Sequence, residues 1–177
     1  MKLAAVILAL LAAGPAFADE TAFTKGPVFE EFGPVADVDA DFAIPKGASL
    51  KTSFDVNKAA EPGALNRTLE SAARFINMHA RAGVPLKKMK LAVVVHGSAV
   101  NDVSNAAQYA EGIGGDNANA PLVAALIGQG VRIIVCGQSA AYYGVEREEL
   151  LPGVEMALSA MTAHAVLQGE GYAINPF

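Results

Sequence analysis

Cys136 is the only cysteine of the chain, and it stands where the β-branched run VRIIVC meets the sequence GQSAA. Because Gly137, Gln138 and Ser139 lead into a predicted helix, Cys136 is expected beside free backbone N–H groups, which favour the nucleophilic thiolate. It is therefore a candidate nucleophile or sulfur carrier. Without a second cysteine it cannot resolve its own disulfide, which disfavours thioredoxin-like redox cycling. A buried, inert thiol is one alternative, since free cysteine is among the most buried residue types. An intermolecular disulfide link is the other.

His96 ends a second apolar run, KLAVVVH, and is followed by glycine. Ligands and chemistry gather at the carboxyl ends of parallel strands, so His96 could serve Cys136 as a base or hydrogen-bond partner if their strands are neighbours. A histidine that merely bonds a nearby carbonyl is the alternative. His79 and His164 have no metal-ligand spacing and are interpreted as structural or surface residues. The predicted site thus has Cys136 and His96 as reactive side chains and a rim of Gly97, Gly137, Gln138 and Ser139.

The other patterns that could carry chemistry are weak. Asp37, Asp39 and Asp41 alternate like calcium ligands, but the glycine and glutamate of an EF-hand are missing. HGSAV lacks the G-x-S-x-G frame of a nucleophile elbow, and GIGGDN follows no strand and contains no lysine. We therefore expect neither a metal nor a cofactor, and a hydrolase or metal protein is the weakest alternative.

The elements that position Cys136 and His96 are read from hydrophobic periodicity and turn residues. Helices are expected from Pro62 to about Gly83, from Asn119, as a cap, to about Gly128, over 139–150 and over 159–168, whereas 98–118 has no clear pattern. Strands are expected at 50–56, 89–97, 131–137, 153–158 and 171–177. Strands that alternate with helices indicate crossover connections, and hence an α/β fold with a mostly parallel five-stranded sheet between helical layers.

Residues 1–18 have the features of a cleaved signal peptide, with Lys2, an apolar segment and the small-x-small sequence Ala16-Phe17-Ala18. The mature chain is then expected to begin near Asp19, in the periplasm or outside the cell. The net charge is −5, and no later stretch reaches the length of a membrane span. Nucleic acid and anionic membranes are therefore not expected as partners, and no membrane span is expected.

Residues 19–49, the N-terminal arm, are rich in Pro, Gly, Phe and acidic residues and show no sustained period. Phe23, Phe29, Phe32 and Phe42 are expected to anchor the arm on the domain formed by residues 50–177 or on a neighbouring subunit. The alanine-rich helices of that domain offer more apolar surface than one small core needs, which favours a homo-oligomer.

The segments LAVVVHG, NAPLVAALIGQGVRIIVCGQSA and LLPGVEMALSAMTAHAVLQGEGYAINPF resemble the DsrE/DsrF-like proteins. The resemblance implies a flavodoxin-like three-layer α/β/α fold, homotrimers or larger rings, and, as in the sulfur-relay members, a cysteine that accepts persulfide sulfur, here Cys136. Those relay members work in the cytoplasm within hetero-oligomers, so an exported protein would need its own sulfur donor and acceptor.

Two functional hypotheses follow from this resemblance. The first is an exported sulfur-handling protein, either a carrier or a sulfurtransferase-like enzyme, that holds persulfide sulfur on Cys136. The second is a non-catalytic module of the same fold that binds a small ligand or supports assembly, in which the cysteine is structural.

Overall fold

A computed structural model describes residues 20–176 of the chain; the predicted signal peptide, residues 1–18, lies outside the described residues. Five parallel strands form one sheet in the order β4-β3-β2-β1-β5, which confirms the predicted α/β fold. The strands are β1 (Leu50–Val56), β2 (Met89–Val95), β3 (Arg132–Cys136), β4 (Glu155–Ala157) and β5 (Ala173–Asn175). The α-helices are α1 (Arg67–Arg81), α2 (Ala106–Gly112), α3 (Ala120–Gly128), α4 (Gly137–Tyr143) and α5 (Ala160–Gly169).

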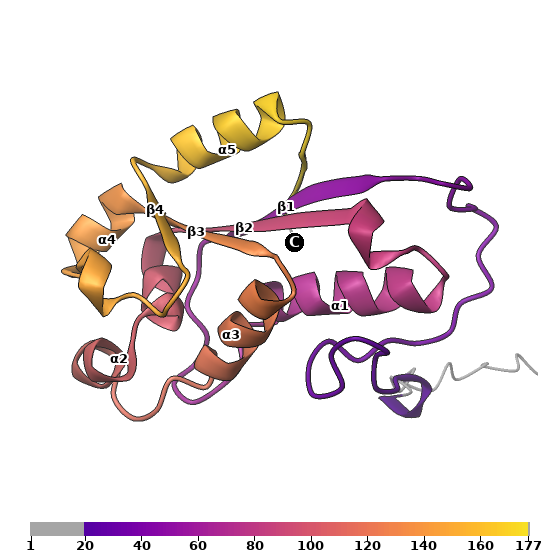
Figure 1. Ribbon diagram of the computed structural model, residues 1–177. Helices are drawn as coiled ribbons and strands as arrows, with labels where there is room; N and C mark the ends of the chain where they lie inside the picture. Colours follow the sequence, from indigo (N-terminus) through magenta and orange to yellow (C-terminus); the bar gives the residue numbers. More distant parts are fainter. Residues whose placement is uncertain (1–19, 177) are drawn as a thin grey trace, which may run out of the picture.

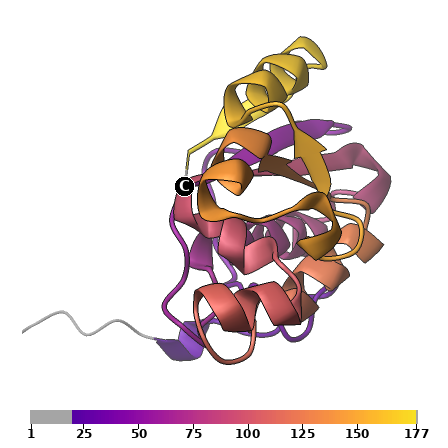
Figure 2. The ribbon, with the colours of Figure 1, turned by 90° about the vertical axis from the view of Figure 1, so that its left-hand side faces the viewer.

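The sheet lies between two unequal helical layers (Figure 1). Helices α1 and α3 cover one face, whereas α5 lies across the other, and the view of Figure 2 keeps the same separation. Successive side chains of β2 point to opposite faces of the sheet. Val93 and Val95 belong to the larger core, which α1 and α3 cover, and Ala92 and Val94 belong to the smaller core, which α5 covers. The central strands are therefore apolar on both faces, as their continuous apolar sequences indicated.

The segments between the strands depart from the expectations in four places. The first helix, α1, begins at Arg67 after its N-cap Asn66 and not at Pro62. The helix expected over 139–150 is wrong in extent, because Gly144 takes a left-handed conformation (φ 67°) and ends α4; a 3₁₀ turn, η4 (Arg147–Glu149), follows. Asn119 does not cap α3 with its side chain, because its Oδ1 accepts a hydrogen bond from the Asn66 N–H instead. The unassigned segment 98–118 falls largely into a 3₁₀ helix, η3 (Gly97–Val103), and α2.

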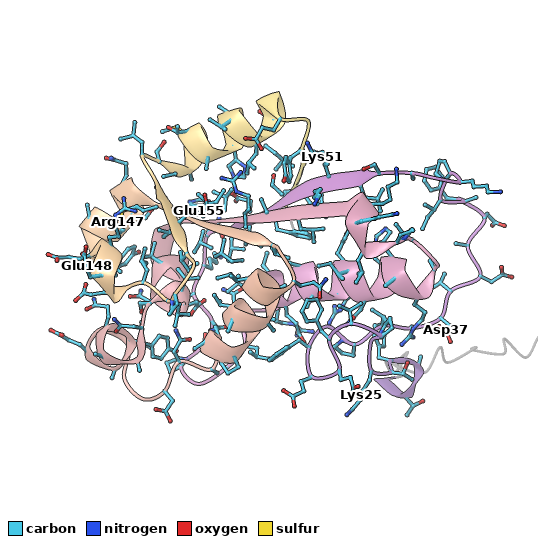
Figure 3. All side chains as sticks on the ribbon, viewed as in Figure 1. Lys25, Asp37, Lys51, Arg147, Glu148 and Glu155 are labelled. Carbon is cyan, nitrogen blue, oxygen red and sulfur yellow. The ribbon has the colours of Figure 1, made fainter. Side chains whose placement is uncertain are left out.

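The N-terminal arm is fastened along α1. Phe29 is buried and Phe32 packs against the larger core, but Phe42 is 91% exposed, so Phe42 does not anchor the arm on this domain; anchoring on a neighbouring subunit stays a prediction. The guanidinium of Arg81, the last residue of α1, donates to the backbone carbonyls of Val35 and Lys25 and to the carboxylate of Asp37. Figure 3 labels Lys25 and Asp37, and both lie beside that end of the helix.

Candidate functional site

Cys136 is the last residue of β3 and the N-cap of α4, as its place between a strand and a glycine predicted. Its Sγ accepts a hydrogen bond from the N–H of Ser139 at 3.5 Å. The residue is 6% exposed, so the thiol is almost enclosed. Enclosure favours the neutral thiol, and the chemistry of Cys136 therefore depends on the donors that surround its sulfur.

Two helix starts supply those donors. Burial raises the pKa of the Cys136 thiol, but hydrogen bonds from the Ser139 hydroxyl and from the N–H groups of Ser139, Ala160 and Gln138 outweigh it, so the pKa lies below its usual value. Gln138 and Ser139 belong to the first turn of α4, and Ala160 is the first residue of α5. Because a thiolate accepts more strongly than a thiol, this ring of donors favours the nucleophilic form.

Ser139 joins this donor ring to the neighbouring strand. Its Oγ accepts a hydrogen bond from the N–H of Gly97 at 3.0 Å, and Gly97 lies two residues beyond the end of β2. The hydroxyl hydrogen is therefore free to point at the sulfur of Cys136, because the oxygen already serves as an acceptor elsewhere. Ser139, expected only at the rim, contacts the thiol itself.

Replacement of Ser139 by alanine tests this donor. We expect Ser139→Ala to raise the pKa of the Cys136 thiol and to slow its alkylation by iodoacetamide at pH 7, by about tenfold for each pKa unit. Ser71→Ala is the matched control, because the Ser71 hydroxyl bonds only the Arg67 carbonyl on α1. An alkylation rate in Ser139→Ala that equals or exceeds that of the wild type would refute the assignment.

The rim glycines make room for the protein's own backbone. A Cβ on Gly137 would lie 2.7 Å from the carbonyl oxygen of Ala157 on β4, and a Cβ on Gly97 would overlap the carbonyl oxygen of Asn57. The Gln138 side chain donates to the Leu158 carbonyl at 3.3 Å. The residues expected at the rim thus join the ends of β2, β3 and β4 closely around the thiol.

His96 and Cys136 follow neighbouring strands, which the sequence left open. Val95 on β2 pairs with Val135 on β3, so the two residues lie one step further along the same edge and face α5. No hydrogen bond among the described residues joins them; the His96 ring turns instead to Asp55, with Nε2 3.1 Å from Oδ1. His96 is thus held by a carboxylate, not by the backbone carbonyl that the structural alternative expected.

Asp55 and His164 form a cluster with His96, and neither of them was predicted to belong to the site. Asp55 lies near the carboxyl end of β1, and its Oδ1 also accepts from Nε2 of His164 on α5, at 2.8 Å. The alternation of LKTSFDV gave Asp55 a detectable place at the strand end. His164 had no such signal, because its contact depends on how α5 lies across the sheet and spans 109 residues of sequence.

An apolar groove of about 230 Å³ opens between α5 and the strands β3 and β4. Ala157, which pairs with Cys136 across the two strands, lies in its wall, whereas Cys136 does not. The other apolar lining residues include Ile134, Met156, Leu158 and Val166. The groove therefore ends beside the thiol and is lined mainly by side chains without charge.

Within residues 20–176, no group of three or more His, Cys, Asp or Glu side chains has the arrangement of a metal site. Asp37, Asp39 and Asp41 accordingly form no such group. In the same part of the chain, every helix is too short or too polar to cross a membrane.

The family model of the DsrE/DsrF-like family matches residues 51–176. The chain belongs to the DsrE/DsrF-like family. The match includes β2 to β5, all of β1 except Leu50, and every residue of the candidate site, so the family resemblance seen in the sequence is confirmed. This family includes sulfur-relay proteins, and membership connects the chain with sulfur-related function at that general level. No curated protein matches the sequence.

Two solved structures agree with a DsrE/DsrF-like fold. A protein of unknown function from Methanobacterium thermoautotrophicum, MTH1491, shares 22% identity with a TM-score of 0.56, covering 73% of this chain and 100% of its own. The ychN protein from E. coli shares 16% identity with a TM-score of 0.53, covering 72% of this chain and 99% of its own. At these identities the likeness concerns the flavodoxin-like α/β fold.

Proposed function

We propose that this DsrE/DsrF-like protein is an exported sulfur carrier that holds persulfide sulfur on Cys136. The observation that carries the proposal is the donor ring, in which Ser139 and two helix starts direct hydrogen bonds at one nearly enclosed sulfur. Such a ring stabilises a thiolate, and it would equally stabilise the charge of a persulfide. Export is inferred from the signal-like residues 1–18.

The proposed step needs no external oxidant or reductant. The Cys136 thiolate attacks the outer sulfur of a donor persulfide, R–S–SH, and a new Sγ–S bond forms. The S–S bond of the donor breaks, and its electron pair leaves on the donor sulfur, which takes a proton. Cys136–SH and R–S–SH thus become Cys136–S–SH and R–SH.

Intact mass measures this step directly. After incubation with glutathione persulfide, the wild type is expected to gain one sulfur atom, which dithiothreitol then removes. Cys136→Ser, which keeps the size of the side chain but lacks the thiolate nucleophile, is expected to gain none. Absence of the adduct in the wild type, together with a thiol that resists alkylation in the folded protein, would refute the proposal.

A non-catalytic binding module is the second candidate, and the apolar groove favours it. Cys136 does not line the groove, so a ligand could occupy this space while the cysteine only packs. Under this alternative the thiol reacts slowly, and Cys136→Ala keeps whatever phenotype a deletion loses. The two candidates therefore differ in the reactivity of one residue.

We also propose that the protein forms a homo-oligomer, a trimer or a multiple of it. Large apolar side chains are exposed around α4 and α5, among them Tyr142 at 82%, Leu158 at 73% and Met161 at 79%. Surface of this kind is usually covered by a partner. Light scattering at micromolar concentration checks this inference, and a monomer would contradict it.

A further inference from the structure

The cluster of Asp55, His96 and His164 is built from three elements that are distant in sequence. The Asp55 carboxylate accepts from His96 through both oxygens, at 3.1 and 3.2 Å, and from His164 through Oδ1, at 2.8 Å. Asp55 lies on β1, His96 follows β2, and His164 lies on α5, which crosses the sheet (Figure 1). A half-buried carboxylate is thus held between two imidazoles on the face of the sheet that carries Cys136.

This geometry decides where the protons of both imidazoles lie. An ionised carboxylate only accepts hydrogen bonds, so each Nε2 that contacts it must carry hydrogen, and a neutral ring then has its lone pair on Nδ1. Burial raises the pKa of Asp55, but the hydrogen bonds from His164 and His96 outweigh it and the pKa is lowered, which keeps Asp55 ionised. Nδ1 of His164 is buried and has no hydrogen-bond partner among residues 20–176, which suits a lone pair better than an N–H.

Nδ1 of His96 is the remaining nitrogen, and no hydrogen bond among the described residues engages it. The His96 side chain is 29% exposed, so water reaches the ring. Neighbouring strands lie about 4.8 Å apart, which brings the backbones of His96 and Cys136 within reach of one bridging water. Nδ1 of His96 is therefore a proton acceptor that no described residue engages, one strand away from Cys136.

We propose that Asp55 is a positioning residue of the Cys136 site, which holds the His96 ring so that its Nδ1 takes the thiol proton, directly or through one water. The imidazolium then returns that proton to the departing donor thiolate, which completes the step R–S–SH + Cys136–SH → R–SH + Cys136–S–SH. The first proton transfer, which activates the thiol, applies to any electrophile. The second, to the donor thiolate, rests on the proposed sulfur-carrier function.

A purely structural role of Asp55 leads to a different expectation. His164 ties α5 to the sheet through Asp55, and the carboxylate charge disfavours a nearby thiolate. If Asp55 acted only through its charge, its neutralisation would favour the thiolate and speed alkylation. If it acts through His96, the same change slows alkylation, so the two roles differ in sign.

Few titratable side chains lie around Cys136, so the two possible roles of Asp55 can be told apart by their effect on the thiol. Asp55, His96 and His164 are the titratable side chains of β1, of the residue after β2 and of α5 on the face of the sheet that carries Cys136. Arg132 and Glu155 are the first residues of β3 and β4, and their side chains pair with each other. The tyrosines of α4, Tyr142 and Tyr143, lie towards its exposed end.

The test is the pH dependence of Cys136 alkylation by iodoacetamide in the full-length protein. Asp55→Asn is expected to slow alkylation at pH 7 by about tenfold or more, with the deficit shrinking towards pH 9, where the thiol ionises without a base. His96→Gln is expected to give the same profile, and the double variant no further loss, because both changes remove one proton acceptor. Asp39→Asn, an exposed change of equal charge, is expected to match the wild type.

Three results would overturn the inference: alkylation of Asp55→Asn at or above the wild-type rate at pH 7, a deficit that is the same at every pH, or a normal profile in His96→Gln. The last variant leaves the pairing of Asp55 with His164 in place, so it keeps the test decisive if Asp55→Asn folds poorly. Sulfur loading is read separately by intact mass. A wild type that takes no sulfur while the variants shift the alkylation profile would refute the carrier function and support Asp55 as the positioning residue.

Discussion

Asn77→Ala is expected to lower the free energy of unfolding by about 3 kcal/mol or more. The variant loses five hydrogen bonds of about 1 kcal/mol each, and the backbone groups that lose their partner are buried. The Asn77 side chain is fully buried within α1. Its Oδ1 accepts from the N–H groups of Val28 and Phe29, and its Nδ2 donates to the carbonyls of Phe29, Phe32 and Gly33. One side chain thus satisfies the backbone of a whole turn of the N-terminal arm.

Urea unfolding of the wild type and the variant measures this effect. Asn105→Ala is the matched control, because Asn105 caps α2 through a single hydrogen bond to the Gln108 N–H and its loss is expected to cost only about 1 kcal/mol. In Asn77→Ala the amides of residues 28–33 should also exchange faster with solvent, since the arm loosens before the sheet unfolds. A stability loss no larger than that of the control would contradict this role of Asn77.

Gly97→Ala is expected to destabilise the protein by about 2–5 kcal/mol, from overpacking of about 1–3 kcal/mol and left-handed backbone strain of about 1–2 kcal/mol. The φ angle of Gly97 is 56°, and an added Cβ would overlap the carbonyl oxygen of Asn57. Because the backbone of Gly97 must move, its hydrogen bond to Ser139 is also expected to weaken. The variant should therefore lose thiol reactivity as well as stability.

Gly63→Ala separates the two contributions to this effect. Gly63 has a φ angle of 75° and nothing within 4 Å of an added Cβ, so it carries the conformational strain without the overlap. It is expected to cost about 1–2 kcal/mol and to leave the alkylation rate of Cys136 unchanged. Equal losses in the two variants would show that the close approach of Gly97 to Asn57 is unimportant.

The sheet could be predicted because its strands are short, apolar and separated by strong turn residues. The run MKLAVVV is buried on both faces, and VRIIVC ends at a glycine, so both strands were found within two residues of their observed ends. The order of the strands could not be predicted, since alternation along one strand carries no information about its neighbour. The wrong extent of the helix after β3 has a local cause, because Gly144 ends α4 after two turns.

The candidate site could be predicted in part. Cys136 and His96 end apolar runs, and that position alone places them at the carboxyl edge of a parallel sheet. Asp55 also lies near the carboxyl end of a strand, but in LKTSFDV it fits the alternation of polar and apolar residues and does not stand out. The place of His164 in the site depends on how α5 packs on the sheet. The sequence therefore identified the candidate thiol and the histidine on the neighbouring strand, but not the carboxylate that contacts this histidine or the serine hydroxyl at the sulfur.

The most direct test of an exported sulfur carrier is the intact mass of the protein purified from the exported fraction of its own cells. The purification uses no reductant and rapid acidification, so that persulfides are preserved. If Cys136 carries sulfur in an exported protein, we expect a chain that begins near Asp19, with a population that carries one extra sulfur atom. Peptide mapping should locate this atom on Cys136, and dithiothreitol should remove it. Absence of the protein from the exported fraction would contradict export, and a chain that retains residues 1–18 would contradict the predicted cleavage. A chain with an unmodified Cys136 that also stays unmodified after exposure to glutathione persulfide would contradict the sulfur-carrier function.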